Sequence, residues 1–210
     1  SSDVCSSDLP YLREIARGLN PITYGEENSL YINGHVTGNS PYLAFEWRAG
    51  KEGEFHQVHT RLIGEYNFPN ALAAVTIGHF FGVEAEKIDK ALNEYEPRNN
   101  RSQLKKTADN TLIIDAYNAN PTSMLAAIGN FRNMQAEKKM LILGDMRELG
   151  KDSAEEHQRI VDYLEEYGFE DVILVGELFA ATRHTYTTYP DAPALIAALQ
   201  KNKPCGKTIL

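Results

Sequence analysis

Residues 112–121, Leu-Ile-Ile-Asp-Ala-Tyr-Asn-Ala-Asn-Pro, predict a buried strand that is joined to a helix through a polar turn. Three apolar residues in a row, ending at Asp115, are typical of a strand that is covered on both faces. Asn120 followed by Pro121 is typical of an N-cap and the first position of a helix. The apolar residues that follow recur at helical spacing: Met124, Ile128 and Phe131.

The polar turn is the expected ligand site. Ligands of open α/β sheets bind in the crevice beyond the carboxyl ends of the strands. This rule places four side chains of the turn in a crevice: Asp115, Tyr117, Asn118 and Asn120. The alternative is structural, with Asn120 capping the helix, Asp115 bonding to loop amides and Tyr117 packing.

The surrounding sequence alternates strands with helices and predicts an α/β fold. Short apolar runs of this kind suit a mainly parallel sheet, so we predict a Rossmann-like domain over residues 98–210. A capping box, Ser153 with Glu156, predicts a helix start. The strands are expected over residues 112–115, 140–143, 172–175 and 208–210, and the last helix over residues 191–200.

Residues 10–97 have a different pattern, in which β-hairpins precede helices. A turn cluster at 49–53 separates an alternating run from a second extended run at 55–63, which predicts a hairpin with one buried face. A helix is expected from Pro69 to Gly82, and a second, short helix is expected around Ile88 and Leu92. The alternating run buries Leu43, Phe45 and Trp47, and the second helix carries Ile88 and Leu92. A proline and two asparagines in residues 96–101 mark a domain boundary.

Composition limits the classes of partner. The 210 residues carry a net charge of -8, which argues against nucleic acid as the main partner. No apolar run approaches the ~20 residues that span a bilayer. An anionic ligand would need local help from helix N-termini, arginines or a metal ion. Cys5 and Cys205 give neither metal spacing nor a disulfide framework, so we expect a reducing, cytoplasmic setting.

The first nine residues, Ser1–Leu9, look foreign to the rest of the chain. The codons AGT-TCA-GAC-GTG-TGC-TCT-TCC-GAT-CT encode them, and that string resembles a common sequencing-adapter oligonucleotide. We therefore expect a translated assembly artefact and leave these residues out of the fold. The alternative is a natural leader.

Other polar residues have both a chemical and a structural interpretation. Asp145 and Glu148 follow the 140–143 strand, where they could hold Mg²⁺ or an amine, or fill a solvated turn. His157 is interpreted as a packing or surface histidine. His56 and His59 point to opposite faces of a strand, make a poor metal pair and are expected at the surface or edge.

Three separated motifs resemble the Mur ligases. They are residues 67–74, residues 115–124 (DAYNANPTSM) and residues 144–150 (GDMRELG), in that order. Within the family the match is to members that join D-alanyl-D-alanine to UDP-N-acetylmuramoyl tripeptide in peptidoglycan precursor synthesis. The resemblance implies that residues 10–97 end a central ATP-binding domain. It also implies that residues 98–210 form a C-terminal ligase domain, which closes over ATP and brings the amine to an acyl phosphate.

The resemblance also implies roles for single residues. Asn67 and Asn70 match the asparagines near the adenine, although on residues alone they could equally cap and pack. Arg101 matches the arginine near the ribose, with a hinge salt bridge as its alternative, and Asp115 matches the aspartate that holds the nucleotide. The loop that faces the dipeptide comprises Tyr117, Asn118 and Asn120. Tyr66 stands where the family has a histidine.

The implied cofactors are ATP and Mg²⁺. The family's phosphate loop and metal ligands would lie before Pro10, and the end of its last domain would lie after Leu210. We therefore expect no catalytic or metal-binding residue within the chain, no ATPase activity by itself, and a monomer. Two other functions stay open, namely a non-catalytic Rossmann-like module that binds a nucleotide or peptide, and a folate polyglutamate ligase.

Overall fold

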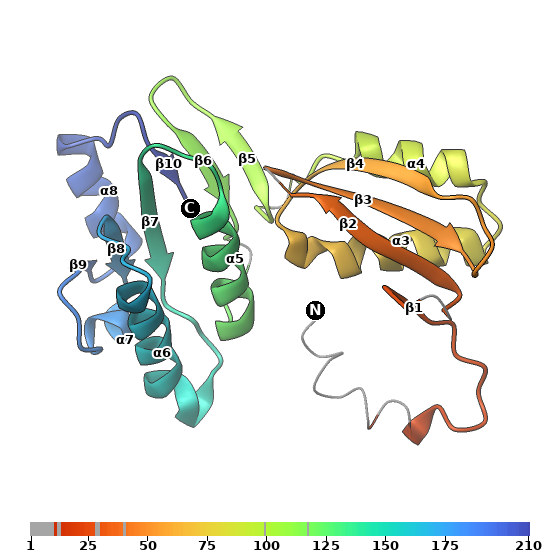
Figure 1. Ribbon diagram of the computed structural model, residues 1–210. Helices are drawn as coiled ribbons and strands as arrows, with labels where there is room; N and C mark the ends of the chain where they lie inside the picture. Colours follow the sequence, from red (N-terminus) through yellow and green to blue (C-terminus); the bar gives the residue numbers. More distant parts are fainter. Residues whose placement is uncertain (1–10, 12–13, 28–29, 40, 99, 117) are drawn as a thin grey trace. The chain divides into compact units, whose positions relative to one another are not determined.

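The computed structural model describes residues 11, 14–27, 30–39, 41–98, 100–116 and 118–210 (Figure 1). The predictions about Ser1–Leu9 and Tyr117 lie outside these residues. The chain divides between Pro97 and Arg98 into two compact units, which are called the first and the second unit below. Among the described residues, no helix is both long enough and apolar enough to cross a membrane.

The first unit contains a four-stranded sheet in the order β1-β2-β3-β4. β2, β3 and β4 are antiparallel neighbours, whereas β1 runs parallel to β2. The predicted hairpin is confirmed, and Leu43, Phe45 and Trp47 are each at most 1% exposed. β2 was not predicted, because its two glycines interrupt the alternation of apolar residues. The strands are β1 (Tyr24–Gly25), β2 (Ile32–Gly38), β3 (Tyr42–Ala49) and β4 (His56–Ile63).

The two helices predicted after the hairpin are both observed. The 3₁₀ turn η1 (Glu65–Asn67) leads into α3 (Phe68–Phe80), which packs against β1, β2 and β3, while α4 (Ala85–Glu94) packs against β4 (Figure 1). At Gly34, a Cβ would lie 2.8 Å from Cδ1 of Leu72 in α3 and 2.9 Å from the backbone oxygen of Glu46, so a side chain there would force its surroundings to shift. Phe68, Leu72 and Val75 of α3 and Ile88 of α4 join the buried strand residues in one core.

The second unit contains a six-stranded sheet in the order β5-β6-β10-β7-β8-β9. Only β5 is antiparallel to its neighbour, so the predicted α/β fold with a mainly parallel sheet is confirmed. The elements are β5 (Gln103–Lys106), β6 (Thr111–Ile114), α5 (Pro121–Asn133), β7 (Lys139–Gly144), η2 (Gly150–Asp152), α6 (Ser153–Glu166), β8 (Val172–Val175), α7 (Glu177–Ala180), β9 (Thr187–Tyr189), α8 (Ala192–Lys201) and β10 (Thr208–Ile209).

The predicted capping box at Ser153 is wrong. η2 already has helical backbone and runs directly into α6, so Ser153 is the first residue of that helix and no side chain caps it. A capping serine needs an extended backbone, which this position does not have. Instead, the backbone oxygen of Ser153 lies 2.6 Å from Nδ1 of His157, one turn further along.

Candidate functional site

A cavity of about 500 Å³ lies where β6, β10 and β7 end, at the edge predicted for a ligand. Its polar part comes from the loop after β6, which supplies Asp115 and Asn118, and from the loop after β7, which supplies Asp145 and Arg147. The apolar part comes from the strands and from α5. It comprises Leu112, Ile113, Ile114, Met124, Ala127, Ile128, Ile142, Leu143, Ile209 and Leu210. The cavity thus has an apolar floor and a polar mouth.

Asn120 caps α5, as the structural alternative proposed. Its Oδ1 accepts a hydrogen bond of 2.9 Å from the amide of Ser123, and its own amide lies 3.4 Å from Oγ of Ser123, which completes a capping box. The side chain that lines the cavity is that of Asn118, which is exposed. The loop therefore divides its two asparagines between the ligand cavity and the helix start.

Asp115 lies beside the segment that begins the second unit. Its Oδ1 accepts a hydrogen bond of 3.2 Å from the amide of Ser102, and the amide of Ala116 donates one of 2.8 Å to the backbone oxygen of Asn100. Arg101, which is exposed, lies between these two attachment points in the sequence. The second unit thus brings Arg101 and Asp115, two of the predicted site residues, into one neighbourhood.

Asn67 and Asn70 belong to the first unit. Asn67 is half-buried, and its Nδ2 donates a hydrogen bond of 2.8 Å to the backbone oxygen of Ile63. Its side chain makes no capping bond to α3, so that part of the structural alternative is not observed. Asn70, in the first turn of α3, is exposed. Neither arrangement tests the predicted contact with adenine, which stays a prediction.

Asp145 caps a helix, a role that neither the metal interpretation nor the solvated-turn interpretation predicted. Its two carboxylate oxygens accept hydrogen bonds from the amides of Phe179 (2.9 Å) and Leu178 (3.0 Å) at the start of α7. Gly176 leaves room for the carboxylate, because a Cβ there would lie 2.1 Å from Cγ of Asp145. Among the described residues, no three His, Cys, Asp or Glu side chains form a group that could hold a metal ion. The rim does not fit Mg²⁺, and no reaction step is assigned to a metal there.

His157 is completely buried and packs, as predicted. Its Nε2 accepts a hydrogen bond of 3.0 Å from the amide of Met146, and its ring meets that of Phe179 edge-on at 4.7 Å between centroids. The imidazole therefore holds the loop after β7 in place through its hydrogen bond with Met146. Arg147, in the same loop, also lines the cavity, although the sequence analysis assigned it no role.

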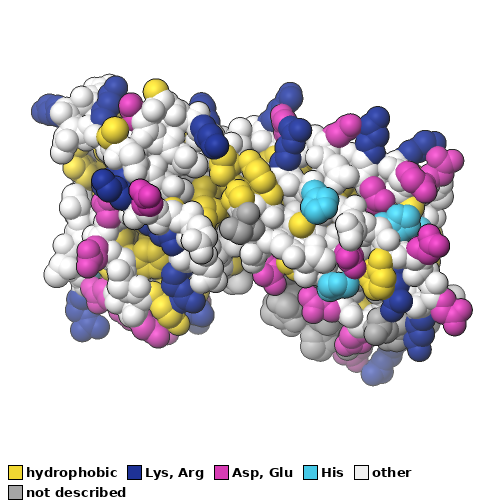
Figure 2. Space-filling view, turned by 45° about the horizontal axis from the view of Figure 1, so that its top comes forward, with side chains coloured by type: hydrophobic (Ala, Val, Ile, Leu, Met, Phe, Trp, Pro, Cys, Tyr) yellow, Lys and Arg dark blue, Asp and Glu magenta, His cyan; other side chains and the backbone are white. Residues whose placement is uncertain are grey.

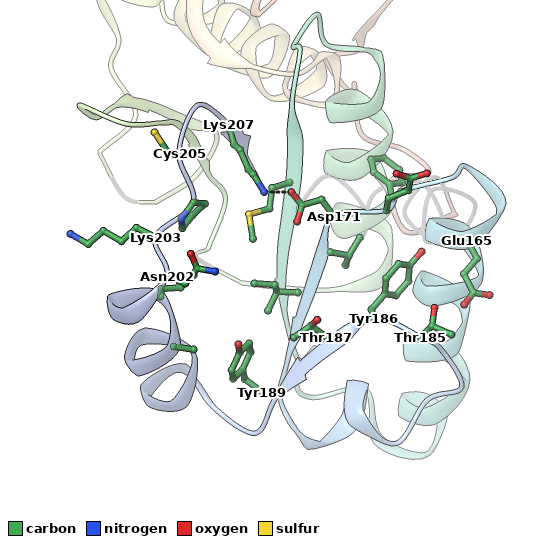
Figure 3. A pocket seen from close by; sticks show the side chains of 18 residues that line it. Glu165, Asp171, Thr185, Tyr186, Thr187, Tyr189, Asn202, Lys203, Cys205 and Lys207 are labelled. Carbon is green, nitrogen blue, oxygen red and sulfur yellow. Dashed lines mark hydrogen bonds and ion pairs between the residues drawn. The ribbon is translucent and has the colours of Figure 1, made fainter.

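A second cavity, of about 900 Å³, lies at the opposite edge of the sheet, where β8 and β9 begin (Figure 3). An ion pair joins Lys207 to Asp171 across it. Burial, and then the negative charge of Glu165, raise the pKa of Tyr186 above its ordinary value. No sequence motif pointed to this cavity, and none of the predicted site residues lines it.

Charge is mixed on the surface. On the face in Figure 2, lysine and arginine side chains are interspersed with aspartate and glutamate and form no continuous basic patch.

Residues 100–210, just over half of the chain, match the family described as "Mur ligase, glutamate ligase domain". The chain belongs to the Mur ligase family. A curated Mur ligase that it resembles is the UDP-N-acetylmuramoyl-tripeptide--D-alanyl-D-alanine ligase of Bacillus subtilis (strain 168), to which it is 34% identical over 160 residues. That alignment covers 71% of this chain and 35% of the relative, so the chain spans about a third of the length of that enzyme.

Solved Mur ligase structures share the fold. MurF from Acinetobacter baumannii is 28% identical to this chain and superimposes on it with a TM-score of 0.77. The superposition covers 97% of this chain and 46% of that one. MurF ligase from Thermotoga maritima, solved in complex with ADP, gives a TM-score of 0.76 over 97% of this chain and 47% of that one. At 18% identity, the second likeness shows the fold alone.

Proposed function

We propose that this chain is part of an ATP-dependent ligase that joins D-alanyl-D-alanine to UDP-N-acetylmuramoyl tripeptide through an acyl phosphate. The reaction belongs to peptidoglycan precursor synthesis and takes place in the cytoplasm. The observation that carries the proposal is the cavity beyond β6 and β7, which the DAYNANP loop lines in a chain that is 34% identical to such a ligase over 160 residues. The chain itself is expected to be a monomer of 23.5 kDa.

The cavity suits a dipeptide. Its volume of about 500 Å³ is within the range of pockets that enclose small ligands. The apolar floor can accommodate the methyl groups of two alanines, while the amide of Asn118 at the mouth can bond to a backbone group or to the carboxylate. Tyr117 and Asn120 belong to the same proposed substrate loop, in which Asn120 acts by fixing the start of α5.

Four residues are proposed to bind the nucleotide. Asn67 and Asn70, in residues 10–97, are assigned to the adenine, and residues 10–97 to the end of the ATP-binding domain. Arg101 is assigned to the ribose and Asp115 to the nucleotide, in the ligase domain of residues 98–210. The proposed cofactors are ATP and Mg²⁺, and Asp145, whose two carboxylate oxygens accept amide hydrogen bonds, is not assigned to the metal.

Binding of the dipeptide to the 210-residue chain tests the proposal. In ¹H–¹⁵N spectra of the labelled chain, D-alanyl-D-alanine is expected to shift the amides of Ala116, Asn118 and Gly144, whereas L-alanyl-L-alanine leaves them in place. Asn118→Ala should weaken the response, and Asn133→Ala, at the exposed end of α5, serves as the matched control.

Other outcomes would identify the alternatives. A response to L-glutamate in place of D-alanyl-D-alanine would favour the folate polyglutamate ligase. Shifts confined to other surfaces, or no response to either ligand, would contradict the assignment of this cavity to the incoming amine.

A further inference from the structure

The turn of residues 100–102 has an unusual backbone. Asn100 and Ser102 have φ angles of 57° and 48°, in the left-handed region. Asparagine is tolerated there, whereas serine is not favoured. Two non-glycine residues in this conformation around one arginine persist only where the surrounding structure holds them. This turn must therefore be held by contacts with neighbouring residues.

The loop after β6 is hydrogen-bonded to the turn. The amide of Ala116 donates to the backbone oxygen of Asn100 over 2.8 Å, and the amide of Ser102 donates to Oδ1 of Asp115 over 3.2 Å. Ser102 is only 2% exposed, so its buried amide needs a protein partner. The first attachment uses backbone atoms alone, but the second depends on the carboxylate of Asp115.

We propose that Asp115 is a positioning residue for Arg101. Its carboxylate keeps Ser102 in the left-handed conformation. The conformation of residues 100–102 then fixes the direction in which the side chain of Arg101 leaves the backbone. The nucleotide then meets an arginine whose orientation is set before binding, which lowers the entropy that binding must remove. This inference rests on the proposed nucleotide-binding role of Arg101. It gives Asp115 a function that does not require contact with the nucleotide.

Amide hydrogen exchange tests the attachment without any ligand. Asp115→Ala is expected to speed exchange of the Ser102 amide at least about tenfold, the loss expected for one hydrogen bond to a charged group. The amides of Ile113 and Ile128, in the core, should not change. Asp115→Asn, which keeps an oxygen at the same place, should restore most of the protection. Unchanged exchange at Ser102 in Asp115→Ala would overturn the proposal.

Affinity for ADP tests the consequence for Arg101. Asn100→Val disfavours the left-handed backbone without altering the charge of Arg101 or Asp115, so it should weaken ADP binding several-fold. Asn100→Gly should bind as the wild-type chain does. Asn133→Val, at the exposed end of α5, is the matched control.

The outcomes separate this inference from the proposed function. Equal ADP affinity in Asn100→Val and the wild-type chain would overturn the positioning role even if exchange at Ser102 responds to Asp115. If the wild-type chain shows no affinity for ADP by saturation-transfer NMR, the proposed nucleotide role fails for this chain, and the link from Asp115 to the nucleotide falls with it.

Discussion

Asp145 shows that a polar residue at a ligand-binding edge can be used by the fold itself. It lines the cavity, yet both carboxylate oxygens accept amides at the start of α7. Its own amide donates to the backbone oxygen of Val175 over 2.9 Å, so β7, β8 and α7 meet at this residue. Gly176, with a φ of 124°, is the residue that makes this arrangement possible.

Gly176→Ala should therefore destabilise the second unit. The added Cβ would collide with the Asp145 carboxylate, so either the cap or the backbone must move, and we expect a loss of about 2–4 kcal/mol in the free energy of unfolding. Gly168→Ala is the control, because Gly168 also has positive φ (69°) but a Cβ added there would meet nothing within 4 Å. That control should lose only about 1–2 kcal/mol, the cost of the left-handed backbone. Equal losses in urea unfolding of the two variants would refute the role of the carboxylate.

At the scale of elements, α4 is attached to the sheet by partly buried polar contacts. Oδ1 of Asp89 accepts a hydrogen bond of 2.7 Å from Nε1 of Trp47, and Oδ2 lies 3.1 Å from Nδ1 of His56. The rings of His56 and Trp47 stack with centroids 4.7 Å apart. His56 lies on β4, an edge strand of the sheet, as expected, but its side chain is only 27% exposed because it packs against Trp47 and Asp89. The contact joins residues more than thirty positions apart, which strand periodicity cannot reveal.

Asp89→Ala should loosen α4 and destabilise the first unit. It leaves the indole N–H of Trp47, a residue only 1% exposed, without its acceptor, so we expect a loss of about 2–4 kcal/mol in unfolding free energy. Glu94→Ala, which removes an exposed pair with Lys90 on the same helix, should change stability by less than about 0.5 kcal/mol. A loss in Asp89→Ala no larger than in Glu94→Ala, measured by thermal unfolding, would contradict the attachment.

Elements with local signals could be predicted from the sequence, and those that depend on distant partners could not. The apolar run before Asp115 and the pair Asn120-Pro121 place β6 and α5 correctly, because both signals lie within a few residues. β10 inserts between β6 and β7 through pairing with residues about seventy to one hundred positions away, and nothing local indicates that order. The same distinction applies to the site. The position of the cavity follows from a general rule of parallel sheets and could be predicted. That Asp145 caps α7 could not, because it depends on the space that the distant Gly176 leaves.

At the scale of the whole molecule, each unit has a core of its own. The first unit packs α3 and α4 on a four-stranded sheet, and the second has a six-stranded sheet with Leu141, Ile160 and Leu174 completely buried. A unit with its own sheet and core can fold by itself. Stability is then a property of each unit, and a substitution in one core need not affect the other.

Residues 98–210 expressed alone should therefore unfold in one cooperative transition on heating. Gly176→Ala should lower the midpoint of that transition by the same amount in the isolated unit and in the whole chain, by several degrees for each kcal/mol lost. Asp89→Ala should leave the transition of the second unit in the whole chain where it is. Differential scanning calorimetry of the chain, the isolated unit and the two variants measures these shifts. A broad transition without a heat-absorption peak in residues 98–210, or a shift of its midpoint by Asp89→Ala in the whole chain, would show that the second unit depends on the first for its fold.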